Sequence, residues 1–302
     1  MRRSANLFLV VLAAFCWLAF TRTTVFAAQV LTVSPTSTQP VISPGASYTG
    51  SMQAINQGSS AYGVTVYAAP YSVNSENYNP DFSPVPGRPN VTSWFHLSVS
   101  SGNLNPGQNL PVNYTINVPK NTQPGGYYAV IFANAKLPKS TQGVGINEQV
   151  GELFYIQVSG PVKESGSLVS WTSSGFQKPP LSTSIKLENT GGVYYISNIK
   201  VVVRDIFGTP KYTLVAQKAV LPQIIREVPI VWNHTPSLGL FKVNGTATIF
   251  GKTVNLPTKY VLVTSPAVRE NTVIIVVIII VLLVLRVVLK KRAAKHARIT
   301  RN

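Results

Sequence analysis

The sequence predicts an all-β protein with two β-sandwich domains in tandem, an N-terminal signal segment and one C-terminal transmembrane helix. Residues 28–270 consist of runs of five to nine residues rich in Val, Ile, Tyr, Phe and Thr, separated by clusters of Pro, Gly, Asn and Ser. These runs show no apolar period of 3.6 residues over a useful length, so strands are expected instead of helices. A third observation, a long apolar run near the C-terminus, predicts the membrane helix.

Residues 1–27 have the features of a secretory signal peptide. Two arginines precede a mostly apolar stretch over residues 7–20, and small residues lead to a cleavage site near Ala28. The alternative is an uncleaved N-terminal anchor, which would leave the following residues on the same outer side. The one cysteine of the chain, Cys16, lies in this segment, so the exported part is expected to have neither disulfides nor thiol chemistry.

The first domain is predicted over residues 28–160. Its most regular strand, residues 110–118, places Val112, Tyr114 and Ile116 on one face and polar residues on the other. The expected strands are residues 30–34, 48–56, 62–69, 94–98, 110–118, 127–135 and 151–159. Short strands separated by frequent turns are typical of an immunoglobulin-like (Ig-like) sandwich.

A long loop is predicted over residues 70–90, and it carries the candidate binding residues Tyr71, Tyr78 and Phe82. Twenty residues without a regular pattern are long for a connection, so this is either a binding loop or a poorly ordered excursion. Aromatic rings beside Asn side chains are a common way for β-sandwiches to hold sugars. The alternative is that these rings cap the edge of the sandwich.

The second domain is predicted over residues 161–266, after the breaker pair Gly160-Pro161, and it is expected to be a second Ig-like sandwich. Its expected strands are residues 166–172, 183–189, 196–205, 212–217, 227–232, 241–250 and 260–264. Composition predicts turns at residues 189–192 and 207–210. Only eight residues, 265–272, connect this domain to the apolar run.

Residues 273–289 are long and apolar enough to span a bilayer as a helix. The basic residues that set its topology are Arg286, Lys290, Lys291 and Arg292. Since cytoplasmic flanks collect Lys and Arg, residues 290–302 are predicted to be a cytoplasmic tail of a single-pass cell-membrane protein with extracellular N-terminal domains. The lipid bilayer is therefore an expected partner and nucleic acid is not. The alternative for the apolar run is a buried core strand.

The inventory of reactive groups predicts a protein that is not an enzyme, with no catalytic residue, no metal site and no cofactor. His96 and His234 have no Cys, Asp or Glu at a spacing that suits a metal or a catalytic triad. The carboxylate pairs Glu148 with Glu152, and Glu76 with Asp81, are interpreted as solvated ends of strands and loops. No phosphate-binding loop, nucleophile elbow or zinc-protease motif is present.

Two stretches resemble those of known surface proteins. LNPGQNLPVNYTINVPKNTQPGGYYAVIFA, residues 104–133, is similar to pilus-chaperone-like sandwich domains, and VLPQIIREVPIVWNHTPSLGLFKVNGTATIFGKTVNL, residues 220–256, is similar to the second domain of such proteins. Together with the signal, the anchor and the tail, this plan resembles the WxL-interacting protein family of bacterial cell surfaces. The resemblance implies a first domain that associates with peptidoglycan and a second that engages surface or host proteins.

The sequence thus predicts a membrane-anchored, non-catalytic cell-surface protein that binds peptidoglycan, other envelope glycans or surface proteins. One alternative is a chaperone-like assembly factor that acts on surface subunits by strand addition at a sheet edge. A second alternative is a hydrolase of envelope glycans.

Overall fold

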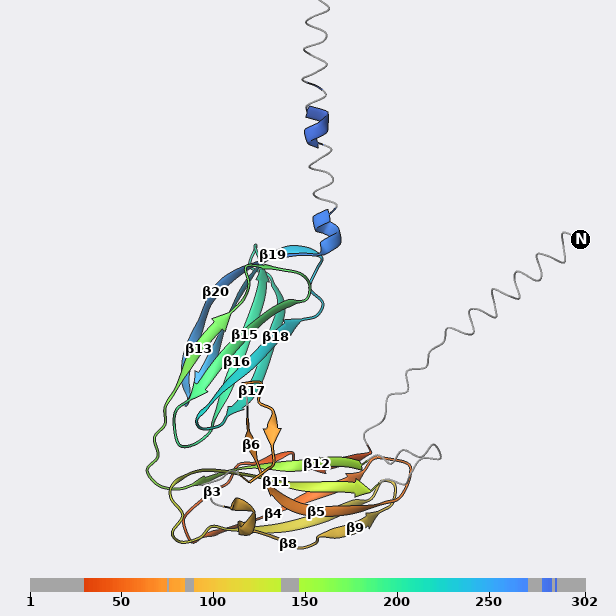
Figure 1. Cartoon of the computed structure of the whole chain (residues 1–302), viewed down its shortest axis with the longest axis vertical. Coiled ribbons are helices and arrows are strands. Elements are labelled where there is room, and N and C mark those ends of the chain that lie inside the picture. The colour runs from red at the N-terminus through yellow and green to blue at the C-terminus, as the bar shows by residue number, and fades with distance from the viewer. Residues whose placement is uncertain are drawn as a thin grey trace, which may run out of the picture.

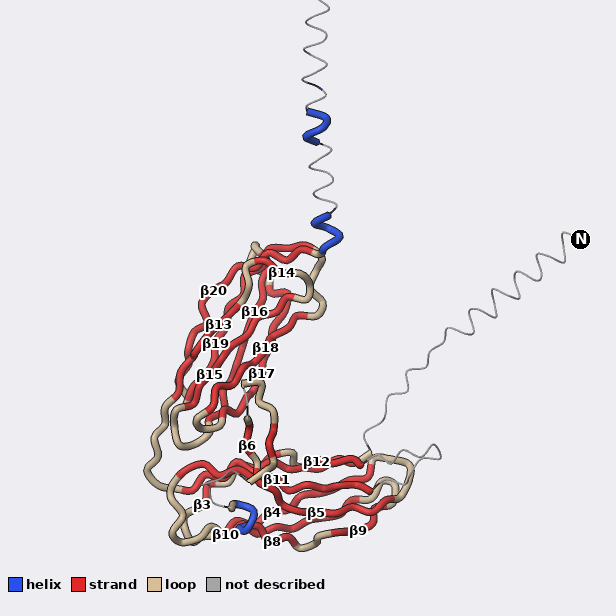
Figure 2. Tube along the Cα trace, in the orientation of Figure 1, coloured by secondary structure: helices blue, strands red, loops and turns tan. Residues whose placement is uncertain are grey.

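The computed structural model describes residues 30–74, 76–84, 90–136, 147–270, 279–283 and 286. Two β-sandwiches follow one another along the chain, and their long directions differ so that the molecule has the shape of an L (Figure 1). Almost all of the regular structure is β (Figure 2). The prediction of an all-β protein built from sandwiches is therefore confirmed.

The first sandwich packs a four-stranded sheet against a six-stranded sheet. The four-stranded sheet has the order β1 (Leu31–Ser34), β4 (Ser47–Asn56), β10 (Asn109–Asn117) and β8 (Phe95–Leu97). The other sheet has the order β2 (Ser37–Thr38), β12 (Asn147–Val158), β11 (Gly125–Lys136), β5 (Tyr62–Pro70) and β9 (Ser101–Leu104), with β3 (Val41–Ile42) also on β12. A short 3-10 helix, η1 (Val91–Trp94), precedes β8.

Alternation along the strands builds the first core. Val112, Tyr114 and Ile116 of β10 are buried, as their spacing predicts. The ring of Phe154 on the opposite sheet meets the edge of Tyr114 at a centroid distance of 5.0 Å. Trp94 of η1 closes one end of this core by packing on Tyr127.

The second sandwich packs a three-stranded sheet against a five-stranded one. The former has the order β13 (Gly166–Thr172), β15 (Leu181–Asn189) and β18 (Ile224–Trp232). The latter has the order β14 (Phe176–Gln177), β20 (Lys252–Thr264), β19 (Leu238–Ile249), β16 (Tyr195–Asp205) and β17 (Pro210–Val220). Phe250 and Gly251 both have positive φ, which suits the tight turn between β19 and β20.

Every strand expected from the sequence overlaps a strand of the structure, but β17 and β20 are longer than the expected residues 212–217 and 260–264, and several short strands were not expected. The strands not expected from the sequence are β2, β3, β6 (Ser72–Val73), β7 (Pro80–Asp81), β9 and β14, of two to four residues each. Strands of this length contain too few residues for a period of two to be recognised. β2, β3, β9 and β14 pair with longer neighbouring strands, whereas β6 and β7 pair with each other.

The predicted loop over residues 70–90 also differs from expectation. It contains a small hairpin of β6 (Ser72–Val73) and β7 (Pro80–Asp81), which reaches from the first sandwich toward the second (Figure 1). The loop is therefore a structural arm of the first sandwich within its described residues, 70–74 and 76–84.

Several predicted segments lie largely outside the described residues. These are the signal segment 1–27, most of the apolar run 273–289, and the tail 290–302 with Lys290, Lys291 and Arg292. Residues 266–270 and 279–283 are helical, and Arg286 is in a helical conformation and exposed. Within the part of the chain that is described, no helix has both the length and the apolar character needed to cross a bilayer.

Candidate functional site

The junction between the two sandwiches is a small aromatic core of its own. Tyr71, Tyr128 and Tyr155 of the first sandwich are buried together with Leu221 of the second. Tyr155 meets Tyr71 edge-on at 6.2 Å and lies 5.1 Å from Tyr194 between ring centroids. Because such rings lose their contacts if the sandwiches separate, the junction resists bending.

Tyr78, at the tip of the β6–β7 hairpin, fastens the first sandwich to the second. Its backbone has φ of 64°, and its hydroxyl accepts the N–H of Leu221 at 2.8 Å. The guanidinium of Arg226 lies 3.7 Å from the centre of the Tyr78 ring. Burial raises the pKa of Tyr78, so the hydroxyl stays protonated and neutral beside the arginine.

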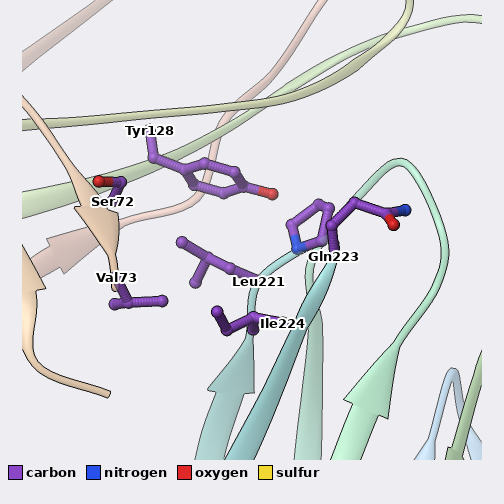
Figure 3. A pocket seen from close by; sticks show the side chains of 7 residues that line it. Ser72, Val73, Tyr128, Leu221, Gln223 and Ile224 are labelled. Atoms are coloured by element: carbon purple, nitrogen blue, oxygen red, sulfur yellow. The ribbon is translucent and has the colours of Figure 1, made fainter. Parts of the chain in front are cut away.

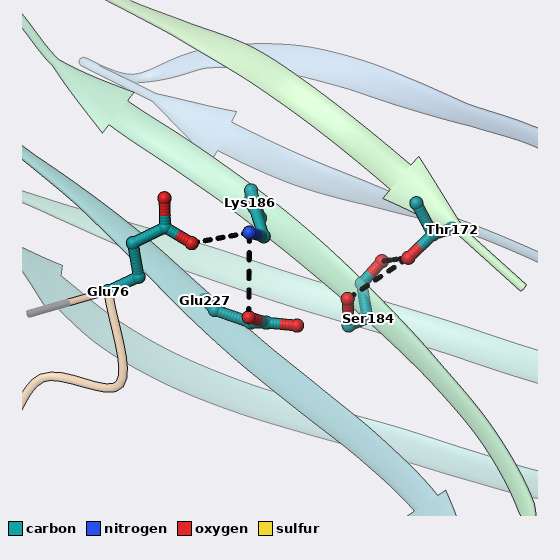
Figure 4. A network of polar contacts seen from close by, with 5 residues as sticks. All are labelled: Glu76, Thr172, Ser184, Lys186 and Glu227. Carbon is teal, nitrogen blue, oxygen red and sulfur yellow. Dashed lines mark hydrogen bonds and ion pairs between the residues drawn. The ribbon is translucent and has the colours of Figure 1, made fainter.

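An ion cluster continues this contact along the face of the second sandwich (Figure 4). The ammonium of Lys186 pairs with Glu76 of the hairpin and lies 3.7 Å from Oε2 of Glu227. The N–H of Glu227 also donates to the carbonyl of Glu76 at 2.8 Å. The three side chains are about a third exposed or more, so their charges add specificity of docking more than stability.

A pocket of about 230 Å³ lies beside the aromatic core, where the hairpin meets the end of β17 (Figure 3). It is lined by Ser72, Val73, Tyr128, Leu221, Pro222, Gln223 and Ile224. A second pocket of about 340 Å³ shares Tyr128, Pro222 and Gln223, and the N–H of Gly126 donates to the carbonyl of Gly192 at its rim. Both pockets have walls from the two sandwiches, so they exist only in this arrangement of domains.

The three aromatic residues predicted to bind a ligand all lie at this junction or next to it. Tyr71 is buried, Tyr78 is packed on the second sandwich, and Phe82 is 38% exposed with its ring 4.8 Å from that of Phe132. The sequence leaves open whether these rings form a sugar-binding surface or cap the edge of the sandwich, and the structure gives the rings of Tyr71 and Tyr78 protein partners. Ligand binding through these three rings stays a prediction.

The outer strand β17 starts at the end of the second sandwich that faces away from the first sandwich, and it ends at the junction. Among the described residues it pairs with β16 alone, so one side of its backbone is open. Tyr212, Leu214 and Ala216 point inward and are half-buried, whereas Val215 is 72% exposed. At the end of this edge nearest the junction, Arg226 donates a hydrogen bond to the carbonyl of Ala219 and so closes the edge there.

Other edges of the two sandwiches are protected in ways that the middle of β17 is not, although β17 itself begins at Pro210 and its register shifts at Lys211. In the first sandwich the edge strands have four residues or fewer. In the second, β14 has two residues, β13 has a register shift between Leu168 and Ser170, and β18 contains Pro229. Short strands, bulges and prolines all discourage pairing with another chain. The middle of β17, from Tyr212 to Gln217, has no charge, no proline and no bulge.

The outer face of the four-stranded sheet is a second unusual surface. Strands β1, β4, β8 and β10 contain no Lys, Arg, Asp or Glu. Ser51 lies opposite Asn113, and Thr49 lies opposite Thr115, which in turn lies opposite His96. Hydroxyls, amides and one imidazole therefore line a shallow groove on this face.

The described part of the chain has no cluster of three or more His, Cys, Asp or Glu that could hold a metal ion. His96 and His234 are both exposed. The interpretation of Glu152 as a solvated strand end was wrong, because its side chain is fully buried and accepts hydrogen bonds from Thr38 and Tyr114. Burial raises its pKa to about 7.

Comparison with known proteins gives similarity at the level of solved structures only, since no family model and no curated protein matches the sequence. One such structure is the class 5 fimbriae chaperone CfaA, with 12% identity, a TM-score of 0.39, and coverage of 78% of this chain and 99% of that chain. The E. coli chaperone DraB has 15% identity and a TM-score of 0.35, covering 77% and 96%. A PapD-like domain of human CEP192 has 15% identity and a TM-score of 0.30, covering 44% and 88%. These values are too low to transfer a function.

Proposed function

We propose that this chain is a non-catalytic assembly or binding factor that holds an extended segment of a partner protein along the edge of β17. The observation that carries the proposal is the open, uncharged middle of an outer strand of eleven residues. A segment added there would satisfy the outward N–H and C=O groups of β17, as in other complexes formed by strand addition. Its alternate side chains would cover the half-buried Tyr212, Leu214 and Ala216.

The rigid junction supports this role. The hairpin contacts of Tyr78 and Arg226 hold the first sandwich next to the end of β17 at the junction. The first sandwich therefore blocks an added segment from extending past Ala219, and this fixes where the segment ends. A fixed stop of this kind favours one register over its neighbours.

We further propose that the factor is held at the cell membrane, as its sequence predicts. The support is the order of a signal segment 1–27, two exported sandwiches, the apolar run 273–289 and the basic tail 290–302. The resemblance to the WxL-interacting family belongs to the same proposal and rests on the sequence alone.

Photo-crosslinking tests the edge directly. A crosslinking amino acid in place of Val215 is expected to capture one partner segment in cells, and mass spectrometry should locate the crosslink in a stretch with alternating apolar residues. The control is a crosslinker at Val41, which is 66% exposed in the first sandwich. Equal capture at both positions, or crosslinks scattered over many sequences, would reject strand addition.

A pair of proline variants tests the backbone itself. Successive N–H groups of a strand point to opposite sides, so Thr213→Pro and Leu214→Pro differ in which N–H they remove. One variant breaks the ladder to β16 and lowers the melting temperature. The other removes only an outward N–H, so it should keep the melting temperature and lose the crosslink. Retention of the crosslink in both variants would show that the backbone edge is not used.

The uncharged sheet face favours a second candidate function, which is binding of a neutral glycan such as the peptidoglycan strand. Surfaces rich in hydroxyls and amides match the groups of a sugar chain, and the paired Ser51 and Asn113 would lie under it. Ser51→Glu with Asn113→Asp should lower retention on purified peptidoglycan at least about tenfold. The control, Thr213→Glu in β17, should not. If Tyr71→Ala or Phe82→Ala lowers retention instead, the ligand lies at the junction.

A further inference from the structure

The end of the second sandwich that faces away from the first is unusually apolar. The β16–β17 turn, the connection between β18 and β19, the loop from β13 to β15 and the end of β20 all meet there, because Asp205 pairs with Phe241 and Leu238 pairs with Thr264. The chain leaves the sandwich at this end, toward helical residues 266–270 (Figure 1).

Large apolar side chains at this end point into solvent. Phe207, in the β16–β17 turn, is 88% exposed, the largest fraction among the exposed large hydrophobic side chains of the described residues. Its neighbour Ile206 is also exposed, as is Leu238 at 59%. Leu240 and Phe176 each lie opposite Leu262, which extends the apolar row from β19 across β20 to β14. Single exposed hydrophobic residues are common, but a row at one end marks a contact surface.

The turn that carries Phe207 is well ordered. Asp205 Oδ1 accepts the N–H groups of Phe207 and Thr209, each at 2.9 Å, and Gly208 has φ of +91°, which suits glycine. The ammonium of Lys211 lies 3.2 Å from the other carboxylate oxygen. The turn therefore holds the phenyl ring outward, and the one acid of residues 205–211 is neutralised.

The length of the chain beyond this end indicates what covers the row. Eight residues, 265–272, separate β20 from the apolar run 273–289. They span about 12 Å as a helix and at most about 28 Å when extended. The headgroup region of a bilayer adds about 5–8 Å on each side of the hydrocarbon core. If the run spans a membrane, this end of the sandwich stays within reach of the headgroups.

We propose that the far end of the second sandwich rests on the outer surface of the bilayer, with Phe207 and Ile206 inserted between lipid headgroups. The inference rests on the proposed membrane anchor and deepens it, because it adds a lipid contact made by the folded part. Aromatic and aliphatic residues on a firm turn can enter the interface, where apolar area leaves water. Lys178 and Lys211 at the same end can face anionic headgroups, and no acid other than Asp205 lies in residues 173–181, 205–211 or 232–240.

Such a contact would hold the second sandwich upright on the membrane. The tether alone would let the sandwich tilt, whereas a second point of attachment at the turn limits tilting. The edge of β17 begins at Pro210, three residues after Phe207, and would then run away from the membrane toward the junction. A bound segment would be presented in one direction.

The test uses the full chain with Cys16→Ser, which removes the one native thiol. Phe207→Cys is labelled with an environment-sensitive fluorophore and reconstituted in vesicles of phosphatidylcholine and phosphatidylglycerol. We expect a blue-shifted emission that is quenched at least about twofold by lipids with a spin label near the headgroup. The controls are Val169→Cys in β13 and Val41→Cys in the first sandwich, both exposed and away from this end, and their labels should not be quenched.

Extraction of the vesicles with alkaline carbonate tests the membrane anchor separately from the lipid contact of the sandwich. A chain that resists extraction while the label at 207 is not quenched would keep the anchor and overturn the lipid contact. A chain that is extracted but is quenched at 207 before extraction would overturn the anchor and keep the contact. A blue shift at 207 without vesicles that grows with protein concentration would identify a second copy of the chain as the occupant and overturn the proposal.

A second variant tests whether the phenyl ring itself inserts, and not only the fluorophore attached at position 207. Phe207→Ser is expected to leave the melting temperature unchanged, because the ring has few protein contacts, and to abolish quenching of a label placed at Ile206→Cys. Persistent quenching at 206 in this variant would show that the phenyl ring does not insert.

Discussion

In the first sandwich, the buried amide of Asn56 donates to the carbonyls of Ser60 and Leu104 and accepts the N–H of Gly58. In the second, Asn189 makes the same set of bonds, donating to the carbonyls of Val193 and Val220 and accepting the N–H of Gly191. One asparagine thus fixes the corresponding corner in each. The two sandwiches differ at their surfaces, because the first has short edges and an uncharged sheet face, whereas the second has a long open edge and many charges.

The features that a sandwich needs in order to fold are therefore distinct from those that it offers to partners. The corner asparagine satisfies backbone groups that the turn would otherwise leave buried and unpaired, so both halves need it. Edge length and surface charge have little effect on either core and can therefore differ. The open edge of β17 and the uncharged face of the four-stranded sheet are the surfaces where the two sandwiches can bind different partners.

The largest expected effect tests the shared corner. Asn56→Ala and Asn189→Ala should each lower the free energy of unfolding by roughly 2–4 kcal/mol, because each leaves buried backbone groups without a hydrogen-bond partner. Thermal unfolding followed by tryptophan fluorescence reports the first sandwich when Trp171 and Trp232 are replaced by Phe, and the second when Trp94 is replaced by Phe instead. Each variant should destabilise its own sandwich. Asn109→Ala, with its side chain at the surface, is the control. Equal shifts of both sandwiches in both variants would show that the halves unfold as one unit.

The next effect concerns Glu152, a buried acid that has no counterpart in the core of the second sandwich among the described residues. Burial raises its pKa to about 7 from 4.5, and its Oε2 has no hydrogen-bond partner. The folded state holds the proton more tightly than the unfolded state, so stability present below pH 4.5 is lost as the pH rises through about 7. The loss is at most about 3 kcal/mol. Glu152→Gln should flatten this dependence in denaturant titrations from pH 4 to 8.5. A profile that rises with pH in the wild type would contradict the assignment.

A smaller effect is expected at the junction, where the two halves meet. Tyr78→Ala removes the hydrogen bond to Leu221 and the contact with Arg226, so the coupling between the sandwiches should fall by about 1–2 kcal/mol. A double-mutant cycle with Arg226→Ala should give an interaction energy of about 1 kcal/mol, and small-angle scattering should show a broader range of interdomain angles. Tyr260→Ala, an exposed ring on the second sandwich, serves as the matched control. Additive effects of Tyr78→Ala and Arg226→Ala would mean that the hairpin does not fasten the domains.

The smallest effect on stability is expected on β17 itself. Val215→Thr keeps a β-branched side chain at a position that is 72% exposed, so the free energy of unfolding should change by less than about 0.5 kcal/mol. Chemical denaturation checks this directly. A larger loss would show that Val215 is covered by another part of the chain and that this edge is closed.

The presence of every strand longer than four residues could be predicted from the sequence because alternation and breakers are local signals. The start of β20 could not, because Pro257 lies inside this strand and is a breaker in the sequence. The burial of Val112, Tyr114 and Ile116 follows from a period of two along a single strand. The turn at Asn189 could also be predicted from its composition. Its buried partners at Val193 and Val220 could not, since the bond to Val220 joins residues 31 positions apart.

The candidate site shows the limit of local signals more clearly. Tyr71, Tyr78 and Phe82 attract attention as an aromatic loop, but Tyr78 is held by Leu221 and Arg226, about 140 residues further along the chain, and Tyr71 shares a buried cluster with Leu221. Likewise, nothing in the sequence distinguishes Glu76 or Glu152 from other acids. In the structure Glu76 pairs with Lys186 of the second sandwich, whereas Glu152 is buried in the core of the first. Their roles follow from packing between distant strands, which no spacing in the sequence encodes.

By itself the sequence determined the all-β class, the division of residues 28–270 into short strands, and the apolar and basic segments at the two ends, because each depends on residues that are neighbours along the chain. The tertiary structure alone decided which strand lies at an edge, which face is uncharged, and how the β6–β7 hairpin joins the sandwiches. Sheet order brings together strands far apart in the sequence, and the edge of β17 exists because no further strand of the described chain pairs beside it.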